Sequence, residues 1–290
     1  MFKPPRFLPT FGLLFGATAW GIIWYPYRLL EQAGFSGVVA SVITYAVALL
    51  LGAVLFRGDW RKLFAHPMTI IPLALAAGWT NLSFVLAVID GEVMRVLLLF
   101  YLSPLWTLLL AKLLLEERTG RRGLLVIALS LAGAFVMLWR PEEGLPMPQN
   151  NAEWLGLSAG LCFALTNVLT RRATQLSLEA KSAAVWGGVT LLALVLLPFH
   201  GTPLPQPSQI TLPSGLLMLA LGAILMVTTL LVQYGITHTP VTRASVIFLF
   251  ELVVAAISSW LLAGELMTTR EWLGGAMIVA ATIFAPHGES

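Results

Sequence analysis

One acidic side chain lies deep within a long apolar stretch of the sequence. Glu251 follows Phe250 and precedes Leu252, in a run that is mostly apolar from residue 244 to 262. A charged group at the centre of a bilayer costs about 2.5–3.5 kcal/mol on insertion scales, so it needs a compensating role. Either Glu251 binds the ammonium group or the proton of a transported solute, or it is hydrogen-bonded within the protein and fixes helix packing. Both interpretations stay open at this point.

Amide and hydroxyl side chains form a second set of candidates within apolar stretches. They are Asn81, Asn167, Thr229 and Gln233. A buried amide needs hydrogen-bond partners, and a polar solute in a central cavity would supply some of them. The alternative is hydrogen bonding between helices, which contributes roughly 0.6 kcal/mol per bond in membranes. We therefore expect these four residues to contact substrate, with helix packing as the competing explanation.

Aromatic residues complete the candidate substrate-binding site. Aromatic faces bind flat apolar groups and ammonium groups, which suits a solute that carries both. Rings near helix ends, such as Trp24, can equally form the belt at the membrane interface. Deeper rings are expected to face the cavity, with packing between helices as the alternative role. These deeper rings are Trp20, Phe84, Tyr101, Phe163 and Phe248.

Composition defines the surroundings of these residues. The chain has 290 residues, of which 58% are hydrophobic and 11% are charged, and its mean hydropathy is +0.86. A soluble domain carries about 25% charged residues, so the solvent of this chain must be lipid. The single cysteine, Cys162, excludes an intramolecular disulfide framework and a cysteine-cluster metal site. Because the histidines show no metal-ligand spacing and no basic run occurs, we expect no cofactor, no metal and no nucleic-acid partner.

Ten stretches are apolar and long enough to cross a bilayer, which needs about 20 residues per helix. No run alternates as the strands of a membrane β-barrel would. The sequence therefore predicts an all-α integral membrane protein with ten transmembrane helices. The first stretch continues through Trp24, which makes it longer than the apolar h-region of a signal peptide, and it is expected to remain uncleaved. The predicted helices cover residues 8–30, 36–56, 68–89, 93–115, 121–139, 153–173, 181–199, 212–236, 241–263 and 271–286.

Lysine and arginine residues are shared unevenly between the two sides of this predicted bundle. With the loops assigned alternately, the side of the N-terminus collects 13 of them and the other side collects 4. Cytoplasmic loops carry the excess of such residues. Both termini are therefore predicted to be cytoplasmic, in a membrane of the bacterial inner (plasma) type. Arg95, close to an outer helix end, is expected to snorkel to the interface or to pair with Glu92.

The two halves of the sequence resemble each other. A shift of 148 positions places Arg95 on Arg243 and Phe100 on Phe248 without any gap between them. Matches of Leu or Val are common by chance in such a composition, whereas matches of Arg are not. Each half holds five predicted helices, and this odd number makes the second half enter the membrane from the opposite side. The predicted domains are a first five-helix repeat at 1–140, a connecting loop at 141–152 and a second, inverted five-helix repeat at 153–290.

One segment near the end of each half carries a resemblance to a known family. The segments are YLSPLWTLLLAKLLLEERTGRRG, from Tyr101 to Gly123, and FELVVAAISSWLLAGELMTTREWLGG, from Phe250 to Gly275. They resemble the drug/metabolite transporter superfamily, in particular its EamA-type members. The resemblance implies five plus five helices around a central cavity, lined mainly by helices one, three, four, six, eight and nine. The family usually has Leu-Glu-Pro at the start of the second segment, whereas this chain has Leu252 in place of the proline.

The resemblance also implies a function. Among EamA-type members, the aromatic-rich first helix looks most like the YddG-type exporters of aromatic and other neutral amino acids. It implies a secondary transporter, not an enzyme, that exports amino acids by alternating access, and no nucleotide-binding motif suggests ATP as a direct energy source. The expected partners are a small-molecule substrate, namely amino acids, and membrane lipid, and a monomer suffices to form the site.

Three alternatives remain. The same superfamily includes exporters of drugs and other metabolites, although a phosphate-bearing solute would need Arg or Lys deep in the membrane, where this sequence has none. A membrane-embedded enzyme is less favoured, because the sequence has neither a nucleophile motif nor a metal motif. A channel is less favoured because its pore would more usually come from several subunits.

Overall fold

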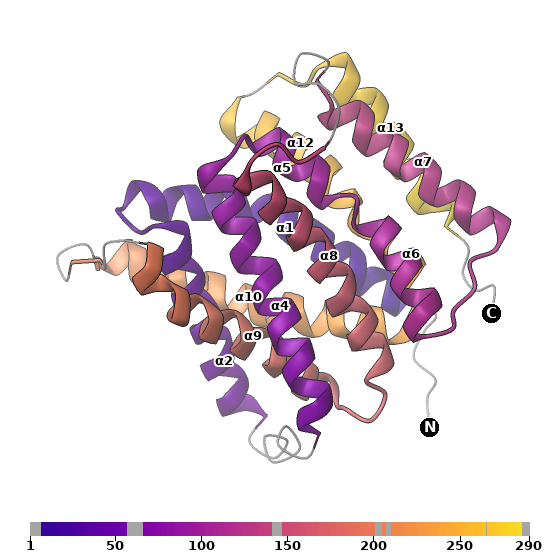
Figure 1. Cartoon of the computed structure of the whole chain (residues 1–290). Helices are drawn as coiled ribbons and strands as arrows, with labels where there is room; N and C mark the ends of the chain where they lie inside the picture. The colour runs from indigo at the N-terminus through magenta and orange to yellow at the C-terminus, as the bar shows by residue number, and fades with distance from the viewer. Residues whose placement is uncertain are drawn as a thin grey trace.

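The chain forms a bundle of helices (Figure 1). The computed structural model describes residues 7–56, 66–140, 147–200, 205–206, 210–264 and 266–285, and none of these residues lies in a strand. The all-α prediction is therefore confirmed for the described residues. The helices are α1 (Leu8–Gln32), α2 (Gly37–Leu55), α4 (Pro67–Asp90), α5 (Val93–Phe100), α6 (Ser103–Leu114), α7 (Arg121–Leu138), α8 (Asn151–Arg172), α9 (Leu178–Leu196), η2 (Leu197–His200), α10 (Leu212–His238), α11 (Val241–Phe248), α12 (Phe250–Ala263) and α13 (Thr269–Phe284).

Nine segments of the described chain are long and apolar enough to cross a membrane. They fall on nine of the ten predicted stretches, and their ends differ by only a few residues from those predicted. The tenth stretch, 271–286, falls on α13, which has 16 residues. That length is shorter than the roughly 20 residues that a helix needs to cross the hydrocarbon core. Residues 141–146 of the predicted connecting loop lie outside the described residues. So do Lys3, Arg6, Arg57, Arg61 and Lys62, five of the cations that the prediction assigns to the cytoplasmic side.

The predicted fourth helix, 93–115, is interrupted. α5 ends at Phe100 and α6 begins at Ser103, which leaves Tyr101 and Leu102 between them. Pro104 occupies the first turn of α6. Because proline has no N–H group, it cannot continue the hydrogen bonding of α5 but is well suited to begin a new helix.

The predicted ninth helix, 241–263, is also interrupted, although it has no proline. α11 and α12 meet at Leu249. There the N–H groups of Leu249 and Leu252 donate to the carbonyl groups of Val246 and Leu249, three residues back in each case. This tighter, 3₁₀-type turn changes the direction of the chain between two α-helices. The break therefore does not depend on the proline that this sequence lacks.

Helices in the two halves match in their bounds. α5 runs from Val93 to Phe100 and α11 from Val241 to Phe248, so both ends lie 148 positions apart. α7 and α13 begin at Arg121 and Thr269, at the same separation. Similar sequence in the two halves thus accompanies similar local structure.

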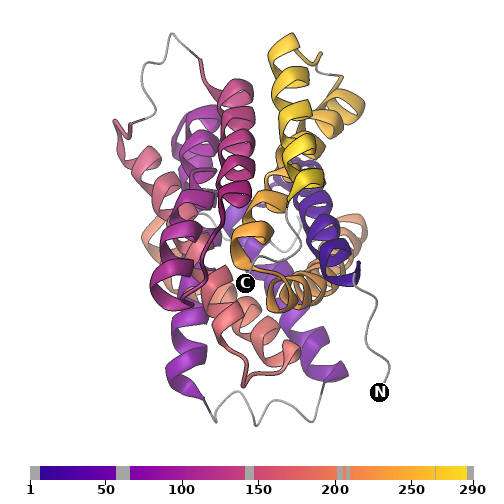
Figure 2. The same ribbon diagram turned by 90° about the vertical axis from the view of Figure 1, so that its right-hand side faces the viewer.

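The first half of the chain consists of α1–α7 and the second half of α8–α13. The first helix of each half packs against the other half. α1 lies along α10, α11 and α12, whereas α8 lies along α4, α5 and α6. α2 packs on α9, and α7 packs on α13 at one edge of the bundle (Figures 1 and 2). The halves are thus joined by an exchange of their first helices, and α1 and α8 border the seam between them.

Arg95 is buried, which corrects the expectation that it snorkels or pairs with Glu92. Its Nε donates to Glu153 Oε1 at 2.8 Å, and a terminal guanidinium nitrogen donates to Glu153 Oε2 at 3.0 Å. Both side chains are less than a tenth exposed. Glu92 lies instead 3.8 Å from Arg140, in a half-exposed pair. The bidentate, buried pair of Arg95 with the start of α8 is the stronger of the two, because solvent screens it less.

Glycine permits close approach between helices at several positions. A Cβ atom on Gly188 of α9 would lie 2.6 Å from the carbonyl carbon of Ala74 in α4. A Cβ atom on Gly160 of α8 would lie 3.0 Å from Cα of Phe100 in α5. In both places the obstacle is backbone, which cannot move aside as a side chain can. Small residues therefore set the spacing of the helices that border the seam.

We predict that Gly188→Ala destabilises the protein. The added methyl group collides with the backbone of α4, and such overpacking costs about 1–3 kcal/mol. Gly187→Ala is the matched control, because a Cβ atom there meets nothing within 4 Å and alanine favours the helix by roughly 1 kcal/mol. Thermal unfolding of the purified protein in detergent measures both. Equal melting temperatures for the two variants would contradict the packing described here.

Candidate functional site

The five aromatic residues predicted for the site form one continuous array of rings. Trp20 of α1 lies 5.7 Å from Phe248 of α11 and 6.4 Å from Phe163 of α8, measured between ring centroids. Phe163 and Phe248 are 5.2 Å apart. These separations fall in the range of about 4.5–7 Å that aromatic pairs prefer. The rings come from both halves, so the array crosses the seam.

Phe100 joins the remaining rings to the array. Its centroid lies 5.5 Å from that of Phe163, 5.0 Å from Phe84 of α4 and 5.1 Å from Tyr101. The sequence prediction left Phe100 out of the site, although it stands at the end of α5 with three ring neighbours, as many as Phe163. The match of Phe100 with Phe248 under the internal shift was the signal that pointed to it.

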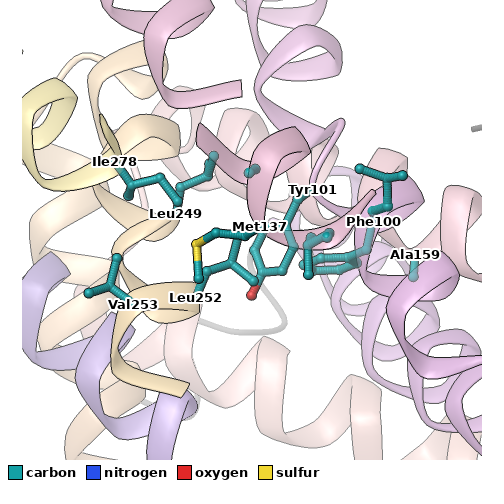
Figure 3. Close-up of a cluster of buried hydrophobic side chains, with 11 residues drawn as sticks. Phe100, Tyr101, Met137, Ala159, Leu249, Leu252, Val253 and Ile278 are labelled. Carbon is teal, nitrogen blue, oxygen red and sulfur yellow. The ribbon is translucent and has the colours of Figure 1, made fainter. Parts of the chain in front are cut away.

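Tyr101 and Glu251 meet where the two helix breaks come together. Tyr101 directly follows α5, and Glu251 is the second residue of α12. Their side chains lie close enough to interact electrostatically. Figure 3 shows the Tyr101 ring between Phe100 and Met137. The first turn of a helix favours a negative group, so the start of α12 is a suitable place for a carboxyl group in the membrane interior.

The amides predicted for the site each keep a polar atom without a partner. Asn167 and Gln233 are both 2% exposed, yet Asn167 Nδ2 and Gln233 Oε1 have no hydrogen bond among the described residues. Asn81 donates to the Tyr45 hydroxyl at 3.4 Å, and its Oδ1 has no partner. A buried amide atom without a hydrogen bond is costly, so its presence in three candidate residues indicates that a ligand or water completes them.

Thr229 differs from these amides. Its hydroxyl donates to the carbonyl oxygen of Leu225 in the same helix at 2.7 Å. The adjacent Thr228 is fully buried and its Oγ1 has no partner. Of these two threonines, Thr228 is thus the one that needs a further hydrogen bond. The sequence could not rank the two, because only the rotation of the helix decides which one bonds to its own backbone.

The site therefore combines a ring array, one carboxyl group and incompletely bonded amides. The rings contact one another and Tyr101 lies close to Glu251, whereas no hydrogen bond of the described residues joins Gln233 or Asn81 to them. Within the described chain, no group of three His, Cys, Asp or Glu residues could hold a metal ion. Such an arrangement can bind a flat apolar group and one cationic or hydrogen-bonding group, and it has no nucleophile with a base for covalent chemistry.

Comparison with known proteins places this architecture in a family. The model of the EamA-like transporter family matches residues 8–139 and again residues 150–285. The chain belongs to this family, within the drug/metabolite transporter superfamily, and is an integral membrane transporter.

Relatives agree with this assignment. An uncharacterized transporter of Pseudomonas aeruginosa is 25% identical over 267 residues, which cover 88% of this chain and 86% of the relative. A riboflavin transporter of Rhizobium johnstonii is 25% identical over 294 residues, covering 93% and 91%. A crystal structure with 17% identity superimposes with a TM-score of 0.76, over 97% of this chain and 98% of the other, and shows that the fold is shared.

We predict that Gln233→Met raises the stability of the ligand-free protein by roughly 1 kcal/mol. The substitution keeps the volume and removes a buried oxygen that has no partner. The same variant should lose most of the increase in melting temperature that a bound substrate gives the wild type. Thr190→Val is the control, because that hydroxyl donates to the carbonyl oxygen of Trp186 in its own helix at 2.8 Å and is not part of the candidate site. Lower stability of Gln233→Met together with an unchanged ligand response would assign Gln233 to helix packing instead.

Proposed function

We propose that this protein is a secondary transporter that exports aromatic and other neutral amino acids by alternating access. Its location is a membrane of the bacterial inner (plasma) type, with both termini in the cytoplasm. The proposed substrate-binding residues are the ten of the candidate site, with Phe100 and Thr228 added. A single chain holds all of them.

One observation carries this proposal: an aromatic array that ends in a carboxyl group. The Tyr101 ring contacts Phe100 in the array, and the Glu251 carboxyl group lies close enough to Tyr101 to interact with it. An aromatic amino acid presents a ring and an ammonium group a few bonds apart, which matches this order of groups. The ammonium would take the hydrogen bond of Glu251 while the ring lies against Phe163 or Trp20.

Two inverted five-helix repeats, at 1–140 and 153–290, supply the mechanism in this proposal. The matched bounds of α5 and α11, and the two separate matches of the family model, support it. An inverted pair has a site near the membrane midplane that can open to either face when one half rocks against the other. In the arrangement described here the rings pack directly on one another, so a substrate would separate Trp20 and Phe248 from Phe100 as it enters.

Export of another flat metabolite is the second candidate, because one relative is a riboflavin transporter. An aromatic array would also hold the ring system of riboflavin. Riboflavin has no ammonium group, however, and would leave Glu251 without a cationic partner. The carboxyl group is thus the feature that favours an amino acid over a neutral heterocycle.

The proposal predicts saturable counterflow of L-phenylalanine and L-leucine in liposomes that contain the purified protein. Glu251→Gln keeps the shape of the side chain and removes its charge, and we expect it to reduce this flux by about tenfold or more. Glu92→Gln is the control, because Glu92 is half exposed in a weak pair with Arg140. Counterflow of radiolabelled amino acids is the measurement.

Riboflavin serves as the competing solute in the same vesicles. Saturable movement of riboflavin without saturable movement of amino acids would refute the proposed substrate class. Amino-acid flux that is equal in Glu251→Gln and the wild type would remove Glu251 from the site.

A further inference from the structure

A cavity of about 410 Å³ lies at one end of the bundle, away from the ring array. The loop from α6 to α7, the last turn of α8, the start of α11 and the end of α13 surround it. Its size falls within the range of about 300–1,000 Å³ that is typical of small-molecule sites. Its floor is apolar, with Val126, Ile127 and Val246, and its rim carries charged side chains.

Arg243 lines this cavity and has no partner among the described residues. It is partly buried, and its Nε is fully enclosed without a hydrogen bond. Arg95, 148 positions earlier, occupies the matching place on α5 and holds the Glu153 carboxylate with two hydrogen bonds. Arg243 thus lacks the carboxylate that its counterpart has.

Glu116 lines the same cavity in an unusual backbone conformation. Its φ angle is 57°, which makes it the one residue other than glycine with a positive φ angle among the described residues. The residue 148 positions later is Gly264, with a φ angle of 71°. Both residues follow the end of a helix, where glycine avoids the strain that a side chain causes. The first half therefore keeps a carboxylate at a position where the second half uses glycine.

The other described charged residues at the rim of the cavity do not pair with Arg243 or Glu116. Glu117 accepts from Nε of Arg171 at 3.2 Å and from the N–H of Val241 at 3.2 Å, so it is already bonded. Arg118 is exposed. Oγ1 of Thr119 is enclosed and lacks a partner. The cavity thus offers the cations Arg243 and Arg118, the exposed carboxylate of Glu116 and the Thr119 hydroxyl group above an apolar floor.

We propose that this cavity is a second binding site for an amino-acid zwitterion, at the membrane face where export begins. Arg243 binds the carboxylate as Arg95 binds Glu153, Glu116 binds the ammonium group, and the side chain rests on Val126, Ile127 and Val246. This proposal rests on the proposed export of amino acids and deepens it. A phosphate-bearing solute fits less well, because Glu116 would repel it.

The test uses three ligands that differ only in charge: L-phenylalanine, 3-phenylpropionate and 2-phenylethylamine. Binding is measured with the purified full-length protein in a Glu251→Gln background, which removes the carboxyl group of the ring-array site. Arg243→Gln should lower the affinity for L-phenylalanine and 3-phenylpropionate by about tenfold or more and leave the affinity for 2-phenylethylamine unchanged. Glu116→Gly should lower the affinity for L-phenylalanine and 2-phenylethylamine and leave the affinity for 3-phenylpropionate unchanged.

Melting temperatures separate binding effects from misfolding. Glu116→Gly should unfold at the same or a higher temperature, because glycine relieves the strain at this position. Arg243→Gln should not lower the melting temperature, whereas Arg95→Gln should lower it, because it leaves Glu153 buried without its partner.

Equal affinities of all variants for all three ligands would overturn the cavity site, and so would absence of L-phenylalanine binding in the Glu251→Gln background. Normal amino-acid counterflow in vesicles that contain the wild-type protein would then show that only the cavity proposal had failed. A wild type without saturable flux would refute the proposed function itself.

Discussion

Inside a bilayer no water is available to complete a hydrogen bond, and the arrangement of this protein follows from that constraint. A helix satisfies its own backbone, so a break in a helix is tolerated only where protein surrounds it. The breaks at Tyr101 and Leu249 both lie within one buried cluster. The same cluster contains Tyr101, which lies close to Glu251, so a carboxyl group stands beside the place where both helices are interrupted.

The exchange of first helices gives this meeting point its shape. α1 packs on the second half and α8 on the first. Trp20 and Phe163, one from each of these helices, are therefore in contact across the seam. In the proposed mechanism, motion of one half against the other changes the packing of these rings and would thereby couple the opening of the site to what occupies it. Glycine at positions such as 160 and 188 brings the helices close enough for this contact.

Much of this arrangement could be predicted from the sequence, because a bilayer demands long apolar helices whose ends are visible in composition. The clustering of Trp20, Phe84, Tyr101, Phe163 and Phe248 followed from their depth in those helices. The break at Leu249 could not be predicted, since a 3₁₀-type turn among apolar residues leaves no proline or glycine as a sign. The pairing of Arg95 with Glu153 was missed for another reason: 58 residues separate them, and only tertiary packing brings them together. The difference between Thr228 and Thr229 depends on helix rotation, which the weak amphipathicity of α10 does not reveal.

The central claim is that the two halves lie upside down relative to each other, with the solute site at their seam. Cysteine labelling tests it most directly, in a Cys162→Ser background that removes the native thiol. Glu92→Cys, beside the start of α5, and His238→Cys, beside the start of α11, both replace exposed residues. A membrane-impermeant maleimide added to intact cells should label position 92 and not position 238, and inverted membranes should give the opposite result. Labelling of both positions from the same side would contradict the inverted arrangement and the alternating-access mechanism that depends on it.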